Sequence, residues 1–138
     1  VKGYVVPATG DQIIRFVFEQ KVTARCFLAR ILWLQGSFDA AIAEVEDIVA
    51  FAEAADDRLT LCQVLVQAAC PVALFADDMP RARRFITRLI DESARDGIEF
   101  WQVWGQCFAG VLAVREGNLP IGIKHLGDAL GRLRSISY

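Results

Sequence analysis

The feature that most constrains the fold is a turn segment that occurs three times at nearly equal spacing. The three copies read QGSFDAAI, ADDMPRAR and EGNLPIGI, and their aligned turn residues Gly36, Asp77 and Gly117 are 41 and 40 residues apart. A long apolar run precedes each turn, and apolar residues at helical spacing follow it. Self-similarity at a period of about 20 to 50 residues is typical of repeat architectures. The sequence therefore predicts a helix–turn–helix unit repeated three times.

The middle of the chain holds an uncharged stretch, Leu59–Ala76, which reaches the lower limit of length for a membrane-spanning helix. Gln63, Gln67 and Pro71 interrupt it. The first helix of a middle repeat unit is covered by neighbours on both sides, so the repeat favours an uncharged core helix over a membrane span. Because Pro71 cannot donate a hydrogen bond to the carbonyl of Gln67, we expect a bend there.

Helical spacing of apolar residues from Lys21 onward, with few Gly and Pro residues, predicts an all-α fold. We expect a right-handed array of about three helix–turn–helix repeats of roughly 40 residues. Residues 1–20 are predicted to form a tail or a short helix, although Ile13–Phe18 could equally be extended. The repeat domain is predicted over residues 21–138, with units at about 21–57, 58–97 and 98–138.

The segment GSFDAAI at 36–42 resembles the entry to the second helix of tetratricopeptide repeats. Leu28-Ala29 matches the Leu-small pair in the first helix of that motif. The period here is about 40 residues against about 34 in the family, and Asp77 stands where the family usually has Gly. The likeness is therefore to tetratricopeptide-like repeats with lengthened helices.

Longer stretches resemble the helical-repeat region of large bacterial transcriptional regulators: RFVFEQKVTARCFLARILWLQG, AACPVALFADDMPRARRFITRLIDESAR and FWQVWGQCFAGVLAVREGN. In such proteins a winged-helix DNA-binding domain and an ATPase-like domain precede the repeats. The resemblance implies that this chain is a cytoplasmic repeat segment of a larger protein, without residues that read DNA or bind nucleotide. The net charge of −2 also argues against a nucleic-acid partner, which normally needs a basic patch.

Catalytic groups are sparse. His125 is the only histidine, which does not suffice for a His-rich metal site, and the four cysteines form no C-x-x-C pair. Three carboxylate pairs are expected to cap helices or face solvent: Asp56-Asp57, Asp77-Asp78 and Asp91-Glu92. We therefore predict a non-enzymatic protein without cofactor or metal.

Equivalent positions on the inner face of the first helices predict an aromatic groove for a protein or peptide partner, because aromatic and Arg side chains are frequent anchors of interfaces. Alternatively, these side chains belong to the core or contact other domains or a second copy in a homodimer. A second hypothesis is a sensor that encloses a small apolar ligand between repeats. The predicted groove residues are Phe27, Arg30, Trp33, Gln67, Phe75, Trp104, Phe108 and Arg115.

The densest group of positive charges lies at the start of the helix that follows the second turn. It consists of Arg81, Arg83, Arg84 and Arg88. It could hold an acidic segment of a partner. Alternatively it is a solvated face, partly neutralised by pairs of Arg88 with Asp91 or Glu92 on the same helix.

Overall fold

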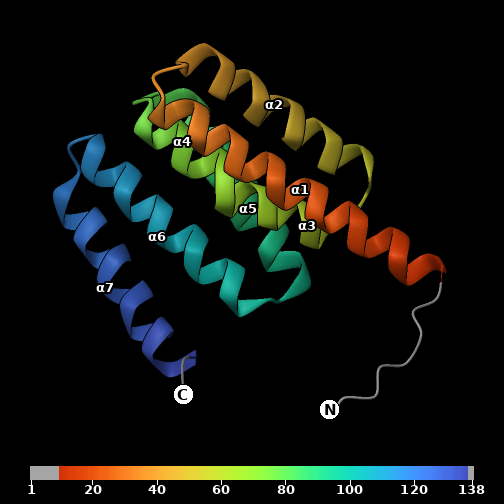
Figure 1. Ribbon diagram of the computed structural model, residues 1–138. Helices are drawn as coiled ribbons and strands as arrows, with labels where there is room; N and C mark the ends of the chain where they lie inside the picture. The colour runs from red at the N-terminus through yellow and green to blue at the C-terminus, as the bar shows by residue number, and fades with distance from the viewer. Residues whose placement is uncertain (1–9, 137–138) are drawn as a thin grey trace.

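The computed structural model describes residues 10–136, and all regular secondary structure within this range is helical (Figure 1). The chain forms three consecutive antiparallel helical hairpins, which confirms the predicted all-α class. The first hairpin is α1 (Gly10–Leu34) with α2 (Phe38–Ala54), and the third is α6 (Glu99–Arg115) with α7 (Leu119–Ile136). The second joins one continuous helix, made of α3 (Arg58–Val64), the π-helical turn η1 (Leu65–Ala69) and α4 (Cys70–Phe75), to α5 (Met79–Asp96).

Helix α1 begins at Gly10 and continues through the boundary that the sequence suggested at residue 20. The segment Ile13–Phe18 is therefore helical rather than extended. It belongs to the same helix as Val22, Cys26 and Ala29, which are buried in the core. The part of the predicted tail at residues 1–9 lies outside the described residues.

The three recurring turns have the same hydrogen-bond pattern. The N–H of each turn residue donates to the carbonyl three residues earlier, and the next N–H donates to the carbonyl five residues earlier. This pair of bonds is the Schellman motif that ends a helix. Gly36, Asp77 and Gly117 have φ values of 83°, 56° and 87°, which Gly adopts without steric cost and Asp tolerates.

The central helix begins after Asp57, whose Oδ1 accepts hydrogen bonds from the N–H groups of Leu59 and Thr60 at 3.1 and 3.3 Å. Within η1 the N–H of Cys70 donates to the carbonyl of Leu65, five residues earlier, directly before Pro71. A π-helical turn therefore directly precedes the proline, and the bend expected at Pro71 stays a prediction. By length and composition alone Arg58–Phe75 could span a membrane, but it is 61% buried, and core helices pass the same test.

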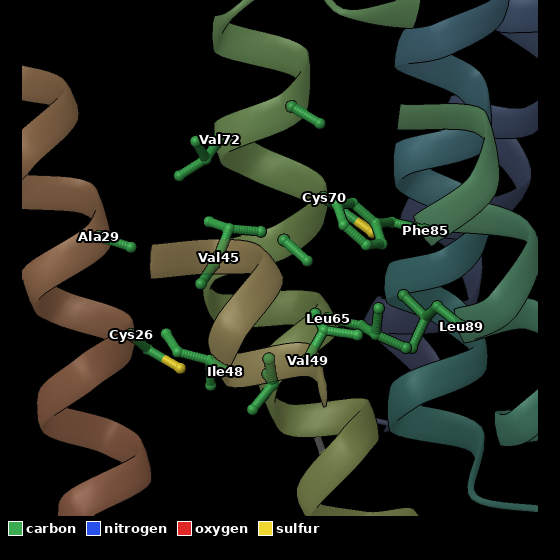
Figure 2. Packing of buried hydrophobic residues seen from close by; sticks show 14 of the residues in the cluster. Cys26, Ala29, Val45, Ile48, Val49, Leu65, Cys70, Val72, Phe85 and Leu89 are labelled. Carbon is green, nitrogen blue, oxygen red and sulfur yellow. The ribbon is translucent and has the colours of Figure 1, made fainter. Parts of the chain in front are cut away.

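The core lies around this central helix, between α1 and α2 on one side and α5 on the other. Figure 2 shows buried side chains from all of these helices meeting the central one. The labelled members are Cys26, Ala29, Val45, Ile48, Val49, Leu65, Cys70, Val72, Phe85 and Leu89. Because cover comes from both sides, the uncharged middle of the sequence is the structural centre of the molecule.

The third hairpin packs closely through glycine. A Cβ atom at Gly122 would lie 2.4 Å from Cγ2 of Val114 and 2.9 Å from the carbonyl oxygen of Gly110. The backbones of α6 and α7 therefore approach to a distance that excludes a side chain at this position. Gly127 on the same helix meets nothing within 4 Å. The glycines of α7 thus have different roles on its two faces.

Candidate functional site

The first helices of the three hairpins run in the same direction in one row, with the central helix between α1 and α6 (Figure 1). Their carboxyl ends, at Leu34, Phe75 and Arg115, lie at one end of the molecule, where the three Schellman turns reverse the chain. All eight residues predicted to form a groove lie on this row. Four of their five aromatic members fall into two clusters, and Phe27 lies outside both.

The first cluster lies at the turn end of α1 and α4. The Trp33 ring centroid is 4.4 Å from that of Phe38 and 6.4 Å from that of Phe75. The Gly36 turn brings α2 back beside α1 and so places Phe38 against Trp33. Trp33 packs on the core, whereas Phe38 and Phe75 are both about half exposed. Together they form an aromatic surface that joins the first two hairpins.

A surface hollow of about 430 Å³ adjoins this cluster. Apolar rings form one part of its wall and charged side chains near the second turn form another. Its lining residues are Trp33, Phe38, Asp39, Ile42, Ala76, Asp78 and Arg81. The hollow can accept an apolar side chain whose neighbours carry polar or charged groups.

The second cluster is a row of rings along α6. Phe100, Trp104 and Phe108 follow one another at intervals of four residues, and so lie on one face of the helix. The centroids of neighbouring rings are 6.5 and 5.8 Å apart. Phe108 packs against the core, while Phe100 is exposed. No aromatic contact among the described residues links this row to Trp33 or Phe75. The rings therefore form two clusters, and a continuous groove stays a prediction.

Gln67 lies between the two clusters, in the π-helical turn of the central helix. Its Oε1 is buried and has no hydrogen-bond partner among the described residues. A buried polar atom without a partner costs about 1 to 3 kcal/mol, and π-helical turns frequently occur at functional sites. Gln67 therefore places an unsatisfied polar atom in a mostly apolar helix.

The two arginines predicted to line the groove have different environments. Arg115 donates from Nη1 to the carbonyl oxygen of Leu74 at 2.7 Å and lies 3.5 Å from a carboxylate oxygen of Asp77. It therefore caps the end of α4 and ties the third hairpin to the second. Arg30 is exposed on α1, beside the equally exposed Phe27. Arg115 is 41% exposed as well, so the two differ in that only Arg30 has no hydrogen bond or ion pair with another described residue.

The four arginines of the predicted basic patch are paired with carboxylates of neighbouring helices. Glu46 of α2 accepts from Arg81 Nε at 2.7 Å and from Arg84 Nη2 at 2.6 and 2.8 Å. Arg81 also pairs with Asp78. Partial burial alone would raise the pKa of Glu46, but the hydrogen bonds from Arg81 and Arg84 outweigh it, and the pKa is lowered from its ordinary value.

The other two arginines complete the network. Arg88 pairs with Glu53 of α2 and, at 2.8 Å, with Glu92, as the sequence suggested for Glu92. Arg83 pairs with Glu116 at the end of α6. The hypothesis of a positive patch for an acidic partner stays a prediction, since Arg83, Arg84 and Arg88 remain 41 to 59% exposed. Within the chain these charges join α5 to its neighbours. The sequence could not reveal this, since the pairing depends on which helices lie beside α5.

A larger surface hollow, of about 910 Å³, was not predicted. It lies between the amino-terminal half of α1 and the connection from α2 to α3. Apolar Ile14 and Phe16 line it together with Arg15, which pairs with Asp57 at 2.7 Å. The sequence signal was the apolar run at Ile13–Phe18, but its ambiguity between helix and strand concealed which side chains would face the same way.

Neither thiols nor acidic groups form a metal centre in residues 10–136, where no group of three or more His, Cys, Asp or Glu side chains could hold an ion. None of the four cysteines forms a disulfide bond among the described residues. Burial raises the pKa of Cys26 to about 11 and also raises those of Cys70 and Cys107.

Comparisons of the chain with protein-family models, with curated proteins and with solved structures each find no match.

Proposed function

We propose that this chain is a right-handed array of three tetratricopeptide-like units. The identical hydrogen bonds of the three turns support this reading, as does the parallel row of first helices. The π-helical turn also accounts for the unequal spacing of the repeat. It inserts one residue into the first helix of the second unit, which fits the 41 residues between Gly36 and Asp77 against 40 between Asp77 and Gly117.

The function that the geometry supports best is non-enzymatic recognition of a protein or peptide partner along the row of first helices. The observation that carries this proposal is the half-exposed pair Phe38 and Phe75 around Trp33, next to an open hollow. Rigid aromatic groups beside a hollow can anchor an apolar side chain at low entropic cost. The rings of α6 offer a second contact on the same row.

The cellular setting that we propose is regulatory. The resemblance to the repeat region of bacterial transcriptional regulators supports a cytoplasmic segment that transmits contacts between partners or domains. In this setting the array would position other domains and would make no contact with nucleic acid. The ion pairs of Glu46 with Arg81 and Arg84 would support this role, because they hold the first and second hairpins in a fixed relation.

Selection from a phage-displayed library of random peptides tests the recognition proposal. We expect enrichment of peptides with an aromatic or large aliphatic residue. Phe75→Ala should weaken the selected peptides about tenfold, which corresponds to about 1.4 kcal/mol, with unchanged helix content by circular dichroism. Ile123→Ala, which also removes an exposed apolar side chain but on α7, is the matched control. Absence of enrichment, or equal effects of both changes, would contradict the proposal.

A small-molecule sensor is the second candidate, and one observation favours it. The unpartnered Oε1 of Gln67 could accept a hydrogen bond from a mostly apolar ligand held between α1 and the central helix. A library of apolar compounds with one donor group should then raise the melting temperature of the wild-type chain. The Gln67→Met variant should lose this shift. Equal shifts in both proteins would rule out this site.

A further inference from the structure

The outward face of α1 carries two rows of exposed side chains, each repeating every seven residues. Both rows consist mainly of large apolar residues. All seven members are exposed. One row is Ile13, Gln20, Phe27 and Leu34, and the other is Val17, Ala24 and Ile31.

Two apolar rows with a period of seven, offset by three and four residues, form the seam through which α-helices pair in coiled coils. On α1 this seam lies opposite Val22 and Ala29, which are buried against α2 and the central helix. The inner face of α1 therefore satisfies its own fold, and the outer seam is additional. Its pattern indicates that the missing cover is another helix.

The same face is covered in the other two hairpins. Ile31, Val72 and Leu112 each lie five residues before the turn residue of their hairpin. Val72 is 0% and Leu112 is 8% exposed, whereas Ile31 is 48% exposed. The seam of α1 is thus a continuation of a surface that this fold buries between hairpins. It remains open in the first hairpin because no described residue lies over it.

We propose that a second copy of this chain covers the seam, with its own α1 antiparallel to the first. The occupant must present a helix with matching rows over a similar length, and α1 itself meets this requirement. In the other helix that exposes several large apolar residues, α7, the outer face is interrupted by Gly127, Gly131 and the ion pair of Lys124 with Asp128. A pair related by a two-fold axis also closes without forming a filament.

The positive charges beside the seam favour the antiparallel orientation of the two helices. Lys21 and Arg30 flank the seam and are exposed, and no acidic side chain lies among the seam rows. A parallel pair would place each of these cations at the same height as its own copy across the pair. An antiparallel pair centred near Ala24 instead separates the two Arg30 side chains by about 18 Å along the helices, at a rise of about 1.5 Å per residue. This proposal concerns the outer face of α1 and does not depend on peptide binding by the aromatic clusters.

Sedimentation equilibrium across a range of concentrations tests the pairing. The wild-type chain should reach twice the mass of one chain. Ile31→Glu, which places a charge in the seam, should raise the dissociation constant of the dimer at least about tenfold. Ile123→Glu on α7 is the matched control and should leave it unchanged. A monomeric wild-type chain at high concentration would overturn the proposal, and loss of association in both variants would instead indicate stacking of α1 on α7.

Cross-linking with a short bismaleimide then tests the orientation. Ala24→Cys lies near the centre of the seam and should give a covalent dimer, whereas Leu34→Cys should not, because the antiparallel arrangement carries the two ends apart. Ala54→Cys, exposed on α2, controls for random collisions. Cross-linking through Leu34→Cys would overturn the antiparallel arrangement. Failure of Ala24→Cys to cross-link a chain that is dimeric by mass would place the interface elsewhere.

Discussion

Helix α1 and the central helix both carry many large apolar side chains, yet these side chains are buried to different extents. In the central helix Leu61, Val64 and Val72 are buried, and the side chains of Thr60 and Gln63 donate hydrogen bonds to Asp57 and Thr23. In α1 large apolar side chains such as Phe16 and Leu28 remain exposed. The central helix has α1 and α2 on one side and α5 and α6 on the other, whereas α1 is covered on one side only.

The difference shows that position in the array, rather than residue type, decides whether an apolar side chain is core. Both helices carry many large apolar side chains, but α1 also carries six charged residues against one in the central helix, and only the central helix has neighbours on both sides. Apolar residues on the open side of α1 contribute little to the stability of a single chain. They are therefore available for contacts with a partner.

The largest expected difference is between equivalent truncations on the two helices. Leu65→Ala removes a fully buried side chain at the centre of the core and should lower the free energy of unfolding by about 2 to 5 kcal/mol. Leu28→Ala removes a side chain that is 44% exposed and should cost less than about 1 kcal/mol in dilute protein. Urea unfolding followed by circular dichroism measures both. Equal losses would show that α1 is covered as fully as the central helix.

A smaller contrast is expected between the two faces of α7. Gly122→Ala introduces a Cβ against Val114 and should lower the free energy of unfolding by about 1 to 3 kcal/mol. Gly127→Ala points into open space and should raise it by about 0.5 to 1 kcal/mol, because alanine loses less backbone freedom on folding. Thermal unfolding compares the two variants. Destabilisation by Gly127→Ala would mean that the outer face of α7 is covered in solution.

Local signals in the sequence were sufficient for most of the helix boundaries, although not for the start of α1. Asp57 and Asp78 accept hydrogen bonds from the first turns of the helices they precede, as their side chains suggested. Gly36 and Gly117 end helices as expected, since the left-handed conformation costs glycine nothing. Each of these features depends only on residues a few positions apart, which is why single-sequence reasoning could find them.

The candidate site was less predictable, because it depends on contacts between distant residues. Arg115 was assigned to a groove, but it binds the carbonyl of Leu74, 41 residues earlier in the chain. Trp104 and Phe75 were placed on one surface, but no ring contact in the described residues connects their clusters. Helical periodicity gives the face on which a side chain lies. The curvature of the array, which decides whether two faces meet, is not written in that periodicity.

The ion pairs between α2 and α5 make a pH-dependent contribution to the stability of the fold. Glu46 has a lowered pKa in the folded chain, so its pairs with Arg81 and Arg84 stabilise the fold above the ordinary value of 4.5, and this contribution is lost as the pH falls through the lowered pKa. Glu46→Gln should therefore cost about 0.5 to 1 kcal/mol at neutral pH, discounted for partial exposure, and almost nothing in strong acid. Urea unfolding at several pH values measures the difference. Asp91→Asn, an exposed change on α5, is the control, and a loss independent of pH would contradict the pairing.

The smallest effect concerns thiol reactivity and leaves stability almost unchanged. Burial raises the pKa of Cys26 to about 11 and that of Cys70 further, so both should react slowly with a disulfide reagent near neutral pH. Cys107 is only partly buried and should react first. A Cys107→Ser variant should lack the fast phase while the remaining thiols react after unfolding. A fast phase that persists in this variant would show that the helices around Cys26 and Cys70 open more readily than their complete burial indicates.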